Sequence, residues 1–130
     1  MEGMNATFEE ALKKGVELFN RQEFYEAHEA WEAAWVDEPS DDRVLLQGLI
    51  QVAAGFYKLQ VGTPVGTVKL LDSGLGKLRG FLENSHGVDL ERLIPEVESW
   101  LTEARRMVAG GQADYDPKRL PRLGYTPWLH

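Results

Sequence analysis

The chain has 130 residues, the length of one domain, and a chain of this size buries about two-thirds of the surface that it exposes when unfolded. A hydrophobic fraction of 43% and a charged fraction of 27% exclude disorder throughout. The lack of cysteine excludes disulfide scaffolds, iron–sulfur clusters, thiolate zinc sites and cysteine catalysis, and the net charge of −7 argues against a nucleic-acid-binding protein.

Hydrophobic residues recur at spacings of three and four, which predicts helices throughout, and no segment shows the two-residue period of a strand. A capping box of Thr7 and Glu10 predicts the start of the first helix. Gly15 lies on the apolar face of this helix, where we expect a close helix crossing. The second helix is predicted from about Glu23 to Asp37.

The third helix is predicted from a cap at Ser40 to about Val61. It is apolar nearly all round, so we expect it at the centre of the fold. Its uncharged stretch from Val44 to Tyr57 holds 14 residues, whereas a membrane span needs about 18 or more. We therefore expect a buried core helix and no membrane association.

Pro64 predicts the first position of a fourth helix that ends near Asn84. The fifth helix is predicted to open with a short turn after Asp89, and its main body is predicted from Pro95 to the Gly110-Gly111 pair. Together these elements predict an all-α, single-domain bundle of about five helices over residues 7–111.

Residues 112–130 contain three prolines and several large apolar side chains, so we expect an extended C-terminal tail that packs on the bundle. The single predicted domain thus covers residues 1–130. The chain starts without a basic region followed by an apolar run, so we expect no signal peptide and a cytoplasmic protein. Residues 1–42 carry 3 basic and 12 acidic side chains. These acids could form solvated helix faces, or they could steer a cationic partner.

The second helix carries the most unusual residues of the chain. His28 and Glu32 are four residues apart, so their side chains meet on one helix face beside tryptophans, in a setting that suits a charge-assisted pair or proton transfer. Buried amides need partners, so we expect Gln47 and Gln51 of the third helix to point at this pair. The candidate acid–base residues are His28, Glu29 and Glu32, and the candidate ligand-binding residues are Tyr25, Trp35, Gln47, Gln51 and Tyr57.

Three interpretations of this cluster stay open. The side chains could satisfy one another in an internal hydrogen-bond network that fixes the register of the helices. They could line a pocket for an unknown small molecule. They could also bind a divalent metal, although Glu32 stands where the zinc-protease helix has its second histidine, and Tyr25 stands where a di-iron bundle has glutamate. No cofactor is predicted.

The residues Phe19-Asn20, Glu26, His28-Glu29, Glu32 and Trp35, followed by Gln47-Gly-Leu-Ile-Gln51 and Ala53, resemble the bacterial, archaeal and plastid family called domain of unknown function 309 (DUF309). The resemblance covers about residues 7–82. It implies a small all-α protein with these signature positions, and no particular activity. Many family members have a histidine after the tyrosine of the third helix, where this chain has Lys58.

We therefore expect a binding or interaction protein with a polar cluster between the second and third helices. A second hypothesis is a hydrolase or lyase that uses His28 as acid–base, oriented by Glu32. A third is a structural module that self-associates through exposed tryptophans and the acidic face.

Overall fold

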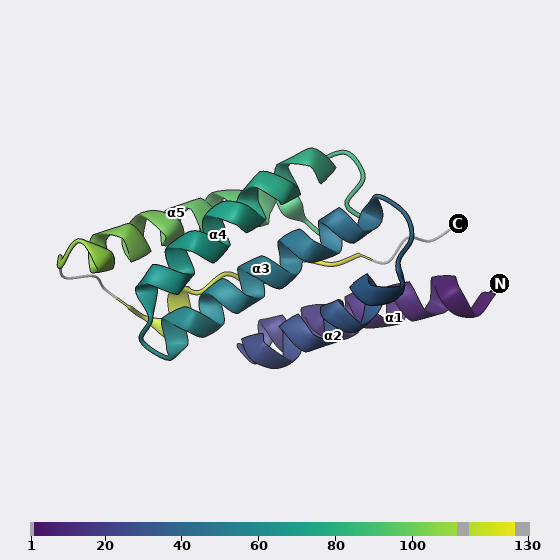
Figure 1. Cartoon of the computed structure of the whole chain (residues 1–130), viewed down its shortest axis with the longest axis horizontal. Coiled ribbons are helices and arrows are strands. Elements are labelled where there is room, and N and C mark those ends of the chain that lie inside the picture. The colour runs from purple at the N-terminus through teal and green to yellow at the C-terminus, as the bar shows by residue number, and fades with distance from the viewer. Residues whose placement is uncertain (1, 112–114, 127–130) are drawn as a thin grey trace.

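The computed structural model describes residues 2–111 and 115–126, with side chains described from Phe8 onward. Over these residues it is a single-domain bundle of α-helices without a strand, which confirms the predicted fold class (Figure 1). The helices are α1 (Glu2–Asn20), α2 (Phe24–Asp37), α3 (Asp42–Gln60), α4 (Pro64–Leu78) and α5 (Leu90–Val108), with short 3-10 helices at Arg79–Phe81 and Pro117–Arg119.

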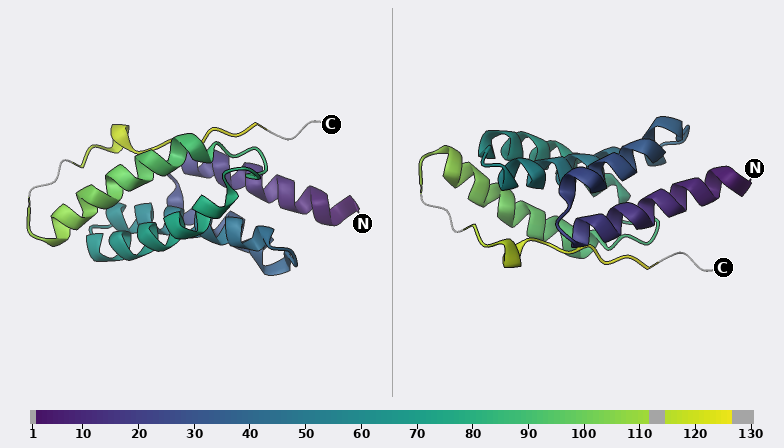
Figure 2. Two further views of the ribbon diagram at one scale, coloured as in Figure 1. Left: turned by 90° about the horizontal axis from the view of Figure 1, so that it is seen from above. Right: turned by 90° about the horizontal axis from the view of Figure 1, so that it is seen from below.

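The helices form two hairpins and a covering helix. α1 and α2 run antiparallel, α3 and α4 run antiparallel, and α5 packs along α4 (Figures 1 and 2). α3 packs against both α2 and α4, so it is the central helix, as its all-round apolar sequence predicts. Its buried residues are Leu45, Leu46, Gly48, Leu49, Ile50, Val52, Ala53, Gly55, Phe56 and Leu59.

Close helix crossings depend on glycines. The indole of Trp31 in α2 lies where a side chain at Gly15 of α1 would be, so the predicted crossing at Gly15 is confirmed. In the other hairpin, a Cβ atom added at Gly74 of α4 would lie 2.9 Å from the carbonyl oxygen of Gly48 in α3. At Gly74 the two helix backbones approach each other directly, whereas at Gly15 the missing side chain makes room for the Trp31 indole.

Two predicted helix ends are wrong. α1 already begins at Glu2, so Thr7 lies inside the helix and does not cap it. α4 ends at Leu78 instead of near Asn84, and the chain continues as the 3-10 turn Arg79–Phe81. Gly80 in this turn lowers helix propensity by about 1 kcal/mol, which favours an early end.

The predicted start of the main body of the fifth helix at Pro95 is also wrong. α5 starts at Leu90 and continues through Pro95 as one helix. The carboxylate of Asp89 accepts a hydrogen bond from the backbone N–H of Arg92 at 3.2 Å and caps the helix. Buried Leu93 and Ile94 hold this first turn in the core, which offsets the one hydrogen bond that proline removes.

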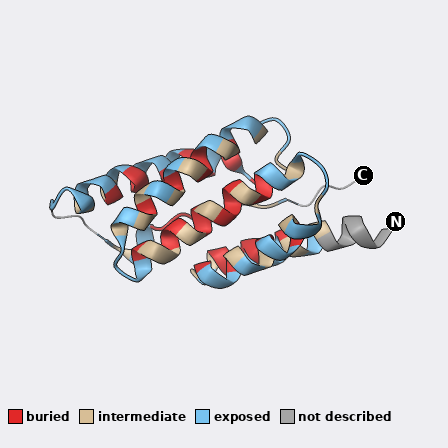
Figure 3. Ribbon diagram, viewed as in Figure 1, coloured by how far each residue is buried: buried red, intermediate tan, exposed pale blue. Residues whose placement is uncertain are grey.

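The tail follows the surface of the bundle, as predicted, over its described part (Figure 2). Leu120 and Leu123 are buried in the core (buried residues are red in Figure 3). The side-chain amide of Asn20 donates to the carbonyl of Leu123 at 2.9 Å and accepts from its N–H at 2.6 Å. Trp128 and Leu129, which also suggested a packed tail, lie outside the described residues.

None of the helices in the described part of the chain combines the length and the apolar character that crossing a membrane requires.

Candidate functional site

The α2 helix brings Tyr25, His28 and Glu32 onto one face, because residues three and four apart are neighbours on a helix surface. The Nε2 atom of His28 lies 3.4 Å from Oε2 of Glu32, and the two side chains are 23% and 51% exposed. The predicted pair therefore exists, at the border of the core. The second ring nitrogen of His28, Nδ1, is buried and has no hydrogen-bond partner within the described chain.

Three rings form a row across the α2–α3 boundary. The ring of Tyr25 lies 5.6 Å from that of His28 and 5.3 Å from that of Tyr57 in α3, measured between centroids. Tyr25 is nevertheless 45% exposed. Two of the predicted ligand-binding residues, Tyr25 and Tyr57, are thus brought together from different helices, and Tyr25 stays partly exposed.

A cavity of about 270 Å³ opens beside this row, where α2 begins and α3 ends. The carboxylates of Glu23 and Glu26 line this cavity. Neither has a basic partner within the described residues, and Glu23 makes no capping hydrogen bond at the start of α2. His28 does not line the cavity. The lining residues are Gln22, Glu23, Phe24, Tyr25, Glu26, Tyr57 and Gln60; below we call this the tyrosine cavity.

The rim of the tyrosine cavity is fixed by the turn between α1 and α2. Gln22 has a φ of 62°, a left-handed conformation that is uncommon for residues other than glycine. The backbone carbonyl of Gln22 accepts a hydrogen bond from the side-chain amide of Gln60 at 3.0 Å. The side-chain amide of Gln22 donates to the backbone carbonyl of Pro117 at 2.6 Å. Gln22 and Gln60 could not be predicted from the sequence, because their contacts join segments that are far apart in the chain.

The two glutamines of α3 do not form the predicted cluster with His28 and Glu32. The side-chain oxygen of Gln51 accepts a hydrogen bond from the Lys77 ammonium of α4 at 3.0 Å, so this prediction is wrong for Gln51. Gln47 is half-buried and makes no hydrogen bond to the part of the chain that the structure describes. The α3–α4 crossing places Gln51 within reach of a lysine, which the spacing within α3 could not reveal.

The remaining predicted residues of α2 lie apart from the tyrosine cavity. Glu29 is exposed. Trp35 is half-buried, and the guanidinium of Arg43 lies 4.5 Å from its ring centroid. Trp31 and Trp100 are buried, so the predicted surface of exposed tryptophans is absent from the described chain.

No three histidine, aspartate or glutamate side chains of the described residues come close enough together to hold a metal ion. His86 lies against Asp42 at the start of α3, with 3.0 Å between Nε2 and Oδ2, instead of joining His28. His130 lies outside the described residues.

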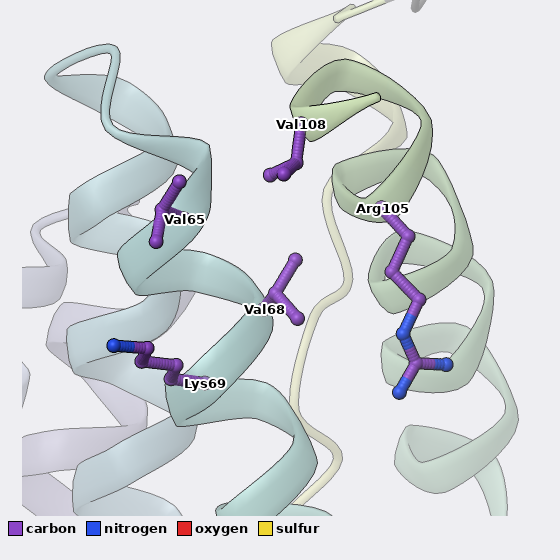
Figure 4. A pocket seen from close by; sticks show the side chains of 5 residues that line it. All are labelled: Val65, Val68, Lys69, Arg105 and Val108. Carbon is purple, nitrogen blue, oxygen red and sulfur yellow. The ribbon is translucent and has the colours of Figure 1, made fainter. Parts of the chain in front are cut away.

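A second cavity, of about 150 Å³, lies between α4 and α5 (Figure 4). Val68 and Val108 lie in the space between the two helices, whereas the Lys69 ammonium points away from α5. Val65 of α4 also lines the cavity. Arg105 extends along α5, and its guanidinium is 3.8 Å from a carboxylate oxygen of Asp72. This apolar cavity contains none of the predicted site residues.

A comparison with curated proteins gave no match. The model of the family described as domain of unknown function (DUF309) matches residues 12–70, which include all of α2 and α3 and every predicted site residue. This match is shorter than the resemblance expected over residues 7–82. The match over residues 12–70 supports the resemblance to the family of the domain of unknown function DUF309.

Proposed function

We propose that this protein binds a ligand in the tyrosine cavity. The observation that carries the proposal is Tyr25, an aromatic ring that is 45% exposed and yet is supported by the rings of His28 and Tyr57. A supported ring loses little conformational entropy when a ligand covers it, and tyrosine offers both an apolar face and a hydroxyl for recognition. The adjoining cavity of about 270 Å³ provides the concave surface that small ligands need.

An acid–base role of His28, in a hydrolase or lyase, has less support. Its Nε2 atom faces Glu32, and its Nδ1 atom is enclosed by protein. A general acid or base must lie within hydrogen-bond reach of its substrate, directly or through one water. Since His28 also does not line the tyrosine cavity, we assign it a supporting role beneath Tyr25.

The test uses three probes of one shape, namely benzamidine, benzamide and benzoate, which are cationic, neutral and anionic at pH 7. Each is titrated into the ¹⁵N-labelled full chain, and backbone chemical shifts are followed. We expect at least one probe to shift residues 22–26 and 57–60. Titrations in which all three probes leave these residues unchanged would overturn the proposal.

The variant Tyr25→Ala should abolish the shifts while the helical circular dichroism stays unchanged, because the ring is not part of the buried core. Tyr115→Ala is the matched control. Tyr115 is also partly exposed, at 37%, but it packs against Trp100 and does not line the tyrosine cavity. Equal loss of binding in both variants would contradict the assignment of the site.

A further inference from the structure

We infer that the ligand of the tyrosine cavity carries a planar cation, a guanidinium or amidinium group such as the end of an arginine side chain. This inference rests on the proposed function and adds the chemical class of the ligand. It depends on the ring faces, the carboxylates and the cation–aromatic contacts that the chain makes elsewhere.

The walls of the cavity favour positive charge in two ways. The faces of Tyr25 and Tyr57 carry the negative part of the aromatic quadrupole, which attracts cations within about 6 Å of the ring centroid. Glu23 and Glu26 add two carboxylates. Among the described residues neither acid has a basic partner and no basic side chain covers either tyrosine face, so a ligand can use all four groups.

The chain places its own guanidinium groups on aromatic rings at two other positions. Arg43 lies 4.5 Å from the ring centroid of Trp35, at the opposite end of α2 from Tyr25. Arg119 lies 5.5 Å from the ring centroid of Trp100. Tyr25 is an exposed aromatic side chain of α2, and no guanidinium group of the described residues lies over its ring.

A planar cation fits this wall better than a compact ammonium. Guanidinium and amidinium groups can stack on a ring while their N–H groups point in the ring plane toward carboxylates, whereas a lysine ammonium is a strongly hydrated point charge. The volume of about 270 Å³ is slightly below the usual range for small-molecule sites, which starts at about 300 Å³, and it suits one such group. The acidic balance of residues 1–42 attracts cations over a longer range.

The same three probes test the charge preference, now through their dissociation constants. We expect benzamidine to bind about tenfold more tightly than benzamide and benzoate to bind most weakly, and we expect added salt to reduce the preference for benzamidine. Glu26→Gln should weaken benzamidine binding about threefold to tenfold and leave benzamide binding unchanged. The matched control is Glu91→Gln, which makes the same change in net charge at an exposed position outside the cavity.

The outcomes separate this inference from the proposed function. If benzamide or benzoate shifts residues 22–26 as strongly as benzamidine does, the cavity binds ligands and the inference about charge is wrong. If benzamidine shifts Val65, Val68 and Val108 instead, it occupies the apolar cavity, and the inference is also wrong. If no probe shifts residues 22–26, the proposed function itself is wrong, and the inference about charge is wrong with it.

A second set of three probes distinguishes the source of the cation. An acetylated arginine amide is compared with its citrulline analogue, which has the same shape without charge, and with an arginine residue inside a short glycine-flanked peptide. We expect arginine to bind at least about fivefold more tightly than citrulline. Tighter binding of the peptide indicates a protein partner, and equal binding indicates a small molecule. Equal binding of arginine and citrulline would overturn the inference.

Discussion

The indole of Trp31 fills the space that the missing side chain of Gly15 leaves in α1. Its Nε1–H donates a hydrogen bond to the carbonyl of Leu12 at 3.1 Å, and the side chain is fully buried. One glycine of α1 and one tryptophan of α2 therefore form a matched contact inside the first helix hairpin.

Gly15→Ala should destabilise the protein by about 2 kcal/mol, because the added methyl group overlaps the Trp31 indole and the cost of overpacking exceeds the gain of about 1 kcal/mol in helix propensity. Urea denaturation measures the change in the free energy of unfolding. The control is Gly76→Ala in α4, where a Cβ atom meets nothing within 4 Å and the gain in propensity should raise stability. A stabilised Gly15→Ala variant would show that the Trp31 indole can move aside without loss of packing.

His28→Ala should lower the free energy of unfolding by about 1–2 kcal/mol, and Glu32→Ala by less than about 0.5 kcal/mol. The side chain of His28 is largely buried and packs against Tyr25, whereas Glu32 is half-exposed and its 3.4 Å contact with the imidazole is long. Thermal and urea denaturation of both variants test this difference. Similar losses in the two variants would mean that the His28–Glu32 contact, and not the packing of the ring, stabilises this face.

Asn20→Ala should cost about 2 kcal/mol, because both backbone hydrogen bonds of Leu123 to the Asn20 amide are lost at a partly buried position. Limited proteolysis should then cut the chain faster within residues 115–126. The control is Asn84→Ala, an exposed asparagine in the turn before α5. Unchanged cleavage of the Asn20 variant would show that Leu120 and Leu123 hold the tail without this amide.

Alkaline pH should weaken the attachment of the tail. Burial raises the pKa of Tyr115 above its usual value of 10.0, and burial followed by the charge of Glu9 raises the pKa of Tyr125. The folded state therefore keeps these protons to higher pH than the unfolded state does. The two protonated tyrosines thus contribute to the free energy of unfolding. Their contribution is complete below pH 10 and is lost as the pH rises from 10 through the pKa values of the folded protein.

Phenolate absorbance checks the tyrosine prediction directly. Two of the four tyrosines should ionise later in the folded protein than in urea, and the free energy of unfolding should fall over the same pH range. The double variant Tyr115→Phe, Tyr125→Phe should lose less of its free energy of unfolding over this alkaline pH range. Identical titration of folded and unfolded protein would refute the prediction.

The sequence by itself determined the fold class and most of its internal order. The helical period of apolar residues predicts the helices, because each helix must bury one stripe of its surface. The nearly all-apolar third helix predicts its own central position, and Gly15 predicts a close crossing. The pairing of His28 with Glu32 was also predictable, since a spacing of four residues brings side chains together within a single helix.

Only the tertiary structure decided what surrounds these residues. Gln51 meets Lys77 instead of His28, because the crossing of α3 and α4 sets which polar side chains come within hydrogen-bond reach. The tyrosine cavity joins the turn before α2 to the end of α3, and the tail holds that turn through Gln22. Periodicity describes one helix at a time, whereas a cavity depends on how two helices and a turn are packed against each other.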